Sequence, residues 1–455
     1  MSGRNDVALA DALEILIDAA RAAGANACDA LGVERESIDV RVRLGETENV
    51  TVARKRRVGM RCLVGGATAV ASTSDLQRSA LSAFAVELAA MARVLPRDEH
   101  AGLPDPIAMA RGPWPDLAIA DEGQPLPDPA EATTLARRAE AAARSSDPRI
   151  VNSEGAELGA ARGRIVFAST AAGFRGSYES TRFGLHAAPV AEEHGRMQRG
   201  AWGHSARRLG DLESPEAIGA EAARRALRQL GARRIPTARL PVVFEAPVAA
   251  SLLGHLASAA SGGSLYRGMS FLCSARGARI LPTFVDVVDD GRRPSGLASR
   301  PFDGEGVATR RTTVVAGGVL SSFMLDSYAA RRLALASTGN ASRGVGGAPA
   351  SGPTNLMLLP GPLSLARIIS GIPRGLLVTG LSGMGVNLTT GDYSRGATGL
   401  WIENGEIAYA VDEITVAGNL RDMFLGIEAV ADDPRPDAKI SCPSLHIAEM
   451  TVAGS

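Results

Sequence analysis

The sequence predicts an α+β protein in which N-terminal and middle α/β units precede a β-rich C-terminal domain with a mainly antiparallel sheet. Three observations support this fold class. Runs of alternating apolar and polar residues, typical of half-buried strands, occur along much of the 455-residue chain. Apolar residues at helical spacing occur mainly before residue 231. After residue 240, strand-like runs alternate with Gly-rich turns, and few helices are expected.

The N-terminal unit, residues 1–95, is predicted to contain two helices and a small strand meander. Apolar residues at helical spacing predict a helix over 6–23, which Gly24 ends. The run Ser72 to Asp75 is a start signal for a second helix over 76–95. Period-2 alternation predicts the antiparallel strands between the helices, over 38–42, 49–53, 59–64 and 67–71.

The next two segments are a linker and a second α/β unit. Residues 96–129 are rich in Pro, Gly and Asp, which predicts a linker. The middle unit is assigned to 130–231, with helices over 129–144 and 215–230 and its clearest strand over 164–169. Residues 231–239 mark the next boundary, so the C-terminal domain is assigned to 240–455.

The clearest single element of the C-terminal domain is a hairpin. Strand-like residues 398–402 and 406–411 flank Asn404-Gly405. Asn-Gly supplies the two positive-φ positions that a tight hairpin turn requires. The sequence therefore predicts a two-residue turn at this point.

Composition excludes several classes of function. Lys+Arg and Asp+Glu balance at 49 each, so no net charge attracts nucleic acid or an anionic membrane. No apolar stretch approaches the roughly 20 residues that span a bilayer. The four cysteines form no CxxC pair, and the start of the chain shows no export signal. A cytoplasmic protein is expected.

Long specific runs in the chain resemble a known family. The C-terminal runs are HLASAASGGSLYRGMSFL (255–272), RPFDGEG (300–306), LDSYAARRLALASTGNASR (325–343), GMGVNLTTGDYSRGATGLWIENGEIAYAVDEITVAGNL (383–420) and PSLHIAEMTVAG (443–454). The N-terminal runs are GMRCLVGG (59–66) and ASTSDL (71–76). Together they resemble the PmbA/TldE branch of the TldD/TldE family, once labelled modulators of DNA gyrase.

The resemblance implies a division of labour between two homologous subunits. In this family the TldD-type subunit carries an HExxxH zinc motif on a helix of its C-terminal domain, and the TldE-type subunit lacks it. The pair is regarded as a peptidase that acts on small or unfolded peptides held in a cleft. The resemblance therefore implies a TldD-type partner, a peptide substrate and a zinc ion in the partner.

The sequence supplies no zinc site or catalytic set of its own. A zinc peptidase needs two or three ligands and a general base, and no HExxH or HExxxH occurs in the chain. The segment that corresponds to the zinc helix is 247–261, with one histidine, His255. In HExxxH register the Glu and the second His would stand at Leu256 and Ala260. We therefore expect His255 to be a packing or interface residue.

The run GDYSRG (391–396) is the strongest candidate for a binding surface. It is predicted to be an exposed loop that carries Asp392, Tyr393, Ser394 and Arg395 and leads into the strand around Trp401. Polar groups on such a loop can hydrogen-bond the backbone of a partner or peptide, and the strand after it can be extended by a peptide. Alternatively, Asp392 and Arg395 pair with each other and brace the turn.

Two functions remain open at this point. The first is a zinc-less partner subunit of a TldD/TldE-type metallopeptidase, which completes the peptide cleft with its C-terminal domain. The second is a non-enzymatic homodimer that binds peptides or a gyrase-linked protein. Neither assigns a catalytic or metal-binding residue to this chain.

Overall fold

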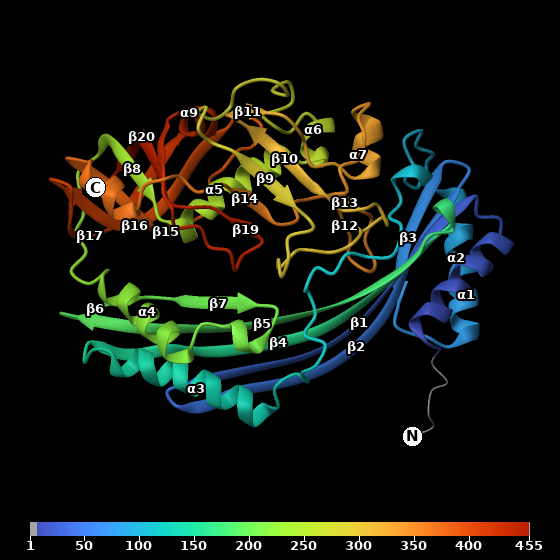
Figure 1. The fold of residues 1–455 in the computed structure, drawn as a ribbon, viewed down its shortest axis with the longest axis horizontal. Helices are drawn as coiled ribbons and strands as arrows, with labels where there is room; N and C mark the ends of the chain where they lie inside the picture. Colours follow the sequence, from blue (N-terminus) through green and yellow to red (C-terminus); the bar gives the residue numbers. More distant parts are fainter. Residues whose placement is uncertain (1–6, 455) are drawn as a thin grey trace.

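The longest strands of the chain form one sheet that crosses both of the predicted α/β units. In the computed structural model, which describes residues 7–454, this sheet has seven strands in the order β3-β2-β1-β4-β5-β6, with β7 also paired to β5 (Figure 1). Its strands are β1 (Ala27–Arg43), β2 (Glu46–Val64), β3 (Ala67–Thr73), β4 (Ile150–Ser169), β5 (Arg175–Glu193), β6 (Arg196–Arg199) and β7 (Trp202–Ala206).

The predicted short strands of the N-terminal unit are wrong in length. The runs 49–53 and 59–64 belong to the single strand β2, which pairs with β1 from Ala27↔Leu63 to Arg43↔Glu46. The stretch between the two runs is polar, so the sequence does not show that the strand continues through it. Its charged side chains are accommodated in the strand because they pair with side chains of the neighbouring strand. Arg54 on β2 forms ion pairs with Glu34 and Glu36 on β1.

The two predicted units share this sheet because β1 pairs with β4. The pairing runs antiparallel from Asp29↔Ser169 to Val42↔Ala156, across more than a hundred residues of sequence. Sequence periodicity reports only local structure, so it does not reveal such a pairing.

Four predicted helices of the first half are confirmed. They are α1 (Leu9–Ala22), α2 (Arg78–Val94), α3 (Pro129–Ser145) and α4 (Pro215–Leu227). The predicted start of the first helix at Asp6 lies outside the described residues. Both α3 and α4 have Pro at the first helical position, and Asp128 and Ser214 cap them through their side chains.

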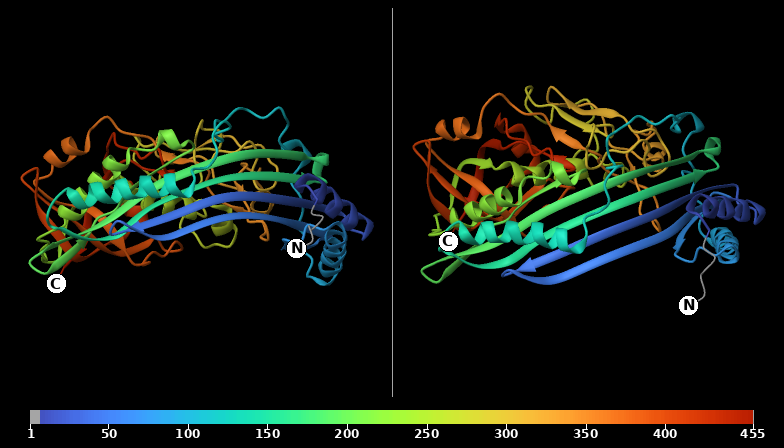
Figure 2. Two further views of the ribbon diagram at one scale, coloured as in Figure 1. Left: turned by 90° about the horizontal axis from the view of Figure 1, so that it is seen from below. Right: turned by 60° about the horizontal axis from the view of Figure 1, so that its bottom comes forward.

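The two faces of the long sheet have different neighbours. On one face, Ala30 and Met60 pack against α1 and α2, and farther along the strands Val40 and Leu158 pack against α3 and α4. Figure 2 shows α3 lying along this face. The other face packs against the C-terminal domain near the α1–α2 end, where Phe167 and its neighbours meet Phe302. The sheet also contacts that domain at its opposite end, through the ion pair of Arg196 with Asp412 and the hydrogen bond from Arg435 to the carbonyl of Gly203.

The C-terminal domain contains two larger sheets with a helix between them, and the small two-stranded sheet β12-β13. A five-stranded sheet has the order β11-β10-β9-β14-β19, and a six-stranded sheet has the order β17-β16-β15-β8-β20-β18, counted within the described residues 7–454. Most neighbouring strands are antiparallel, as predicted; β15–β8 and β14–β19 are parallel. Helix α5 contacts both sheets, at β19 and β15.

The elements of this domain are as follows. The strands are β8 (Ala238–Phe244), β9 (Val287–Asp290), β10 (Arg311–Ala316), β11 (Val319–Leu320), β12 (Ala341–Ser342), β13 (Ala350–Ser351), β14 (Leu356–Leu358), β15 (Arg374–Ser382), β16 (Asp392–Glu403), β17 (Glu406–Asn419), β18 (Ile427–Val430), β19 (Ile440–Ser441) and β20 (Leu445–Ala453). The helices are α5 (Ala246–Ala259), α6 (Gly262–Tyr266), α7 (Ser327–Arg332), α8 (Leu365–Ser370) and α9 (Leu420–Leu425).

The predicted hairpin turn is confirmed. Strands β16 and β17 are joined by Asn404 and Gly405, with φ of 53° and 81°. Among the described residues, no helix is both long enough and apolar enough to cross a membrane.

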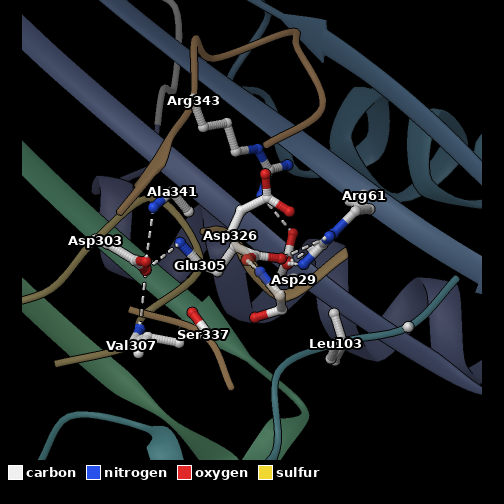
Figure 3. A network of polar contacts seen from close by, with 12 residues as sticks. Asp29, Arg61, Leu103, Asp303, Glu305, Val307, Asp326, Ser337, Ala341 and Arg343 are labelled. Atoms are coloured by element: carbon white, nitrogen blue, oxygen red, sulfur yellow. Dashed lines mark hydrogen bonds and ion pairs between the residues drawn. The ribbon is translucent and has the colours of Figure 1, made fainter. Parts of the chain in front are cut away.

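A buried cluster of ions joins the long sheet to the C-terminal domain. Arg61 on β2 lies 2.5 Å from Asp29 on β1 and 3.1 Å from Glu305, and Arg343 lies 2.5 Å from Asp29. All four side chains are at most 6% exposed. Figure 3 shows Arg61 and Arg343 converging on Asp29. We call these four residues the junction cluster.

Neighbouring residues fix the C-terminal side of the junction cluster. Glu305 accepts the N–H of Ser327, at the first turn of α7. Asp303, two residues before Glu305, accepts backbone N–H groups from Glu305, Val307 and Ala341 (Figure 3). The RPFDGEG run is therefore a turn whose acidic residues hold it to the rest of the protein.

Charge balance explains why the junction cluster is stable in the interior. Burial alone would raise the pKa of Asp29, but the guanidinium groups of Arg343 and Arg61 hold it below its ordinary value. Complete buried networks of this kind are sensitive to loss of one member, because an unpaired buried charge is left behind. The cluster therefore makes docking of the two parts depend on all of its members.

The first prediction concerns Glu305→Gln, which keeps the shape of the side chain and removes its charge. Arg61 then loses one of its two carboxylates, and we expect the free energy of unfolding to fall by about 3–5 kcal/mol. The matched control is Glu36→Gln, since Glu36 forms an exposed ion pair with Arg54; we expect a change within about 1 kcal/mol. Denaturant unfolding measures both, and equal effects of the two substitutions would contradict the importance of the cluster.

Candidate functional site

The predicted exposed loop at 391–396 is instead the beginning of strand β16. Gly391 has φ of 90° and turns the chain into the strand, which starts at Asp392. On one side Tyr393 pairs with Gly418 and Arg395 with Val416 of β17. The polar sequence indicated a loop, but alternation along the strand sends its polar side chains to two different faces.

Both edges of this part of β16 are already occupied. Residues 385–387 fold back along it: the N–H of Ser394 donates to Gly385 at 2.7 Å, and the N–H of Asn387 donates to Asp392 at 2.9 Å. Farther along, Trp401 pairs with both β15 and β17. The prediction that a peptide extends the sheet at this strand is therefore wrong, because no free strand edge is left here.

The alternative pairing of Asp392 with Arg395 is also absent from the described structure. Asp392 accepts a hydrogen bond from the hydroxyl of Thr390 at 2.5 Å and a longer one from Asn419. Residues three apart on a strand point to opposite faces, so Asp392 and Arg395 cannot meet. Asp392 and Ser394 point to solvent.

The other face of the strand brings three predicted site residues together. Tyr393 and Arg395 point toward α5, where the ring of His255 meets the ring of Tyr393 edge-on, with centroids 6.1 Å apart. Tyr393 is 2% exposed. We call His255, Tyr393 and Arg395 the α5–β16 cluster.

Each member of the α5–β16 cluster has a buried polar atom without a hydrogen-bond partner in the described chain. These atoms are Nε2 of His255, the hydroxyl of Tyr393 and Nε of Arg395. Buried polar atoms in proteins are nearly always satisfied, so an unsatisfied one requires an explanation. Three of them at one place indicate a site that another group completes.

The electrostatics of the cluster define what that group must be. Burial lowers the pKa of His255, and Arg395 lowers it further, so the imidazole is neutral at pH 7. Burial also raises the pKa of Tyr393 to about 12, so the phenol keeps its proton. Arg395 is then the only charge among the three. The cluster offers a cation and a hydroxyl donor, which suit a carboxylate or a carbonyl oxygen.

Helix α5 lacks the residues of a zinc site. It is formed by Ala246–Ala259, close to the predicted 247–261. Leu256 and Ala260, at the positions of the missing Glu and His, are 1% and 0% exposed and belong to the apolar core. Within residues 7–454, no three His, Cys, Asp or Glu side chains are grouped so that they could hold a metal ion.

Trp401 is the remaining predicted site residue, and its aromatic contacts are with residues outside the α5–β16 cluster. It is 5% exposed and stacks on Tyr409 with ring centroids 6.1 Å apart. The guanidinium of Arg374 lies 5.3 Å from its ring. In this chain Trp401 is a core residue of the six-stranded sheet.

Comparison with known proteins places the whole chain in one family. Three family models match in order: PmbA/TldA metallopeptidase domain 1 over residues 28–92, the central domain over 124–230 and the C-terminal domain over 237–454. Metalloprotease PmbA of Escherichia coli O157:H7 is 39% identical over 417 residues, which cover 92% of this chain and 90% of that protein. A PmbA homologue of Haemophilus influenzae is 35% identical over 98% of this chain and 96% of its own length.

Two further similarities bear on the fold and on partners. The crystal structure of a candidate modulator of DNA gyrase from Bacteroides thetaiotaomicron has a TM-score of 0.91 and 27% identity, covering 98% of this chain and 99% of that one. A TldD homologue of Haemophilus influenzae is 27% identical over 292 residues, 58% of this chain and 60% of that protein. One organism thus holds relatives of both the PmbA and the TldD kind.

The second prediction concerns the hydroxyl of Tyr393. Because it is buried without a partner, Tyr393→Phe removes an uncompensated polar group, and we expect the isolated chain to gain about 1 kcal/mol in stability. The matched control is Tyr328→Phe, since Tyr328 donates to Asp98 at 2.8 Å; it should lose a similar amount. Denaturant unfolding measures the stability of both variants. If Tyr393→Phe destabilises the chain as much as Tyr328→Phe does, the hydroxyl of Tyr393 has a hydrogen-bond partner and the prediction is wrong.

The third prediction concerns pH. The pKa of His255 is lower in the folded chain than in the unfolded one, so the unfolded state binds the proton more readily. The stability contributed by neutral His255 is present above about pH 6.5 and is lost as the pH falls toward the folded pKa. We expect unfolding free energies at pH 7.5 to 5 to fall more steeply for the wild type than for His255→Gln. Parallel curves would exclude this assignment.

Proposed function

We propose that this chain, which belongs to the PmbA/TldD metallopeptidase family, is the zinc-less partner subunit of a two-subunit peptidase. Its partner is a TldD-type subunit that holds the zinc ion and the general base. The observation that carries this proposal is α5, whose core positions Leu256 and Ala260 replace the two further residues of a zinc motif. A helix packed in this way has no room for a ligand and a base beside His255.

The α5–β16 cluster supports a role that is completed by a second molecule. A carbonyl or carboxylate oxygen beside Tyr393 and Arg395 would accept hydrogen bonds from the hydroxyl and from Nε, both of which lack acceptors. A charge-assisted bond formed in a dry site is among the stronger polar contacts in proteins. The oxygen would come from the backbone of the partner subunit or from the peptide held between the subunits.

The surroundings of the cluster support an interface on the C-terminal domain. Segment 383–391 carries Met384, which is 94% exposed, and segment 269–271 carries Met269, which is 55% exposed. One hydrogen bond, from the N–H of Phe271 to the carbonyl of Leu388, joins the two segments. Exposed methionines adapt to varied apolar surfaces, and stable subunit interfaces are apolar at their centre.

A homodimer that binds peptides without cleaving them is the second candidate. In that case the same surface would meet a second copy of this chain, and each α5–β16 cluster would be completed by its copy. The presence of PmbA and TldD relatives in one organism favours the heterodimer. The two candidates differ in the composition of the assembly and in its zinc content.

The fourth prediction tests the pairing directly. The chain is co-expressed with a homologue that contains HExxxH, and the product is examined by size analysis, elemental analysis and a peptidase assay. We expect a complex of the two chains with roughly one zinc ion and with peptidase activity, because the partner supplies a complete ligand set. The chain alone should hold no stoichiometric zinc. About one zinc per isolated chain, lost in His255→Ala, would overturn the proposal.

Variants of the cluster refine the same experiment. Arg395→Ala should reduce assembly or peptidase activity of the complex about tenfold or more, since it removes a charge-assisted hydrogen bond. Glu403→Ala, at the exposed far end of β16, is the control and should leave both unchanged. A large drop in the melting temperature of the isolated Arg395→Ala chain, with normal activity of the complex, would assign Arg395 to folding instead.

A further inference from the structure

The long sheet carries a groove whose lining residues are separate from the α5–β16 cluster. It lies over β1, β4, β5 and β7 and has a volume of about 740 Å³. Its lining includes alternate residues of these strands, such as Gly159 and Gly184, that point away from α3 and α4. The C-terminal domain borders the groove, since Gly296 accepts from Arg207 and Arg435 donates to the carbonyl of Gly203. We call it the sheet groove.

Glycines form the floor of the sheet groove. Gly159 stands opposite Asp39 on one side and Gly184 on the other, and Gly184 stands opposite Ser205, so one row across the sheet is nearly free of side chains. Neither glycine has a positive φ, so the backbone conformation does not require glycine there. A Cβ at Gly184 would lie 3.4 Å from Ser205. The floor is hollow because side chains are missing, and the fold does not demand their absence.

Arginines without carboxylate partners stand at one end of the groove. Arg182 lies one row beyond Gly184, and Arg207 follows β7 beside it. Arg207 is 6% exposed and donates to the carbonyl groups of Thr181 and Gly296 at 2.9 and 2.7 Å. Within the described residues neither arginine forms an ion pair. A buried cation that meets only carbonyl oxygens is costly, and an anion in the groove would offset that cost.

The electrostatics of Arg207 agree with a missing anion. Burial, together with the nearby charge of Arg182, lowers the pKa of Arg207 to about 10. Arg207 has five N–H donors, and three hydrogen bonds to protein acceptors are present in the described structure. The guanidinium therefore retains donors for a ligand.

Carboxylates stand in the floor row and one row beyond it, on the side away from Arg182. Asp39 leans over the floor, since a Cβ at Gly159 would lie 3.0 Å from its Oδ1. Glu157 lies one row farther, beside His186. Neither carboxylate forms an ion pair in the described part of the chain. Ala161, which pairs with Arg182, and Glu157 are four residues apart on β4. At the rise of a strand, the two charged ends of the groove are therefore about 13 Å apart.

We propose that the sheet groove binds a short extended peptide by its two free termini, with the C-terminal carboxylate at Arg182 and Arg207 and the α-ammonium at Asp39 and Glu157. Unpaired charges of opposite sign at the two ends complement a zwitterion, whereas a nucleic acid would require basic residues throughout. The span of about 13 Å matches roughly four extended residues. That the ligand is a peptide rests on the proposed function; the chemistry of its two ends rests on the groove.

Calorimetric titration of the full-length chain with tetraalanine tests this inference. We expect binding of the peptide with free termini, and a loss of affinity of about tenfold or more when the C-terminus is amidated or the N-terminus acetylated. Arg182→Gln should weaken binding of the free acid and remove the effect of amidation. Gly184→Val should abolish binding by filling the floor. The control Arg164→Gln changes an exposed arginine on the opposite face of β4 and should bind normally.

Further outcomes distinguish a terminal carboxylate from a side-chain carboxylate as the bound anion. They also distinguish failure of the groove proposal from failure of the subunit-pairing proposal. A blocked peptide with an internal Glu, binding as well as tetraalanine, would overturn the assignment to a terminal carboxylate. Absence of tetraalanine binding, or equal binding of the free and amidated peptides, would overturn the proposal that the sheet groove binds a peptide by its termini. An active two-chain complex without groove binding would overturn only this inference, and groove binding without any complex would overturn only the pairing.

Discussion

Four buried ionic side chains hold the two halves of this protein in a fixed relation. Arg61 and Asp29 come from adjacent long strands, while Glu305 and Arg343 come from separate turns of the C-terminal domain. Next to them Phe302 inserts among aromatic rings of the sheet, with centroids 5.2 Å from those of Phe174 and Tyr178. The aromatic contact buries apolar surface between the sheet and the C-terminal domain, and the ion pairs determine which residues of the two parts come into contact. The C-terminal domain is also held at the opposite end of the sheet, where Arg196 pairs with Asp412 and Arg207 donates to the carbonyl of Gly296.

This arrangement gives the long sheet three kinds of surface. One face is covered by helices, parts of the other face contact the C-terminal domain, and the sheet groove over β1, β4, β5 and β7 is polar and hollow. Alternation along a strand separates the helix-facing residues from the others, as with Leu158 in the core and Gly159 in the groove. The C-terminal domain has its own unsatisfied place at the α5–β16 cluster. Both places have polar groups that the chain itself leaves without complementary partners.

The sequence allowed the helices, the Asn404-Gly405 turn and the α+β class to be predicted, because local spacing and turn chemistry determine them. It did not allow the length of β2 or the pairing of β1 with β4 to be predicted, since both depend on contacts between distant residues. The sequence marks His255 as a packing or interface residue of a helix and Tyr393 and Arg395 as residues of an exposed loop, and it does not show that the three form one cluster. Strand alternation at 392–395 was hidden, because polar residues occupy both faces. Glu305 lay in a specific run, RPFDGEG, yet nothing local in the sequence indicates its partner Arg61.

Helix α5 lacks a zinc motif, and its His255 joins Tyr393 and Arg395 of β16 in a cluster of unsatisfied polar atoms. The central claim is that the α5–β16 cluster lies in the contact with a TldD-type subunit. Hydrogen–deuterium exchange of the chain, alone and in the presence of that subunit, tests this claim most directly. We expect new protection of backbone amides over residues 383–395 and in α5. Protection confined to residues 7–230, with 383–395 unchanged, would contradict it.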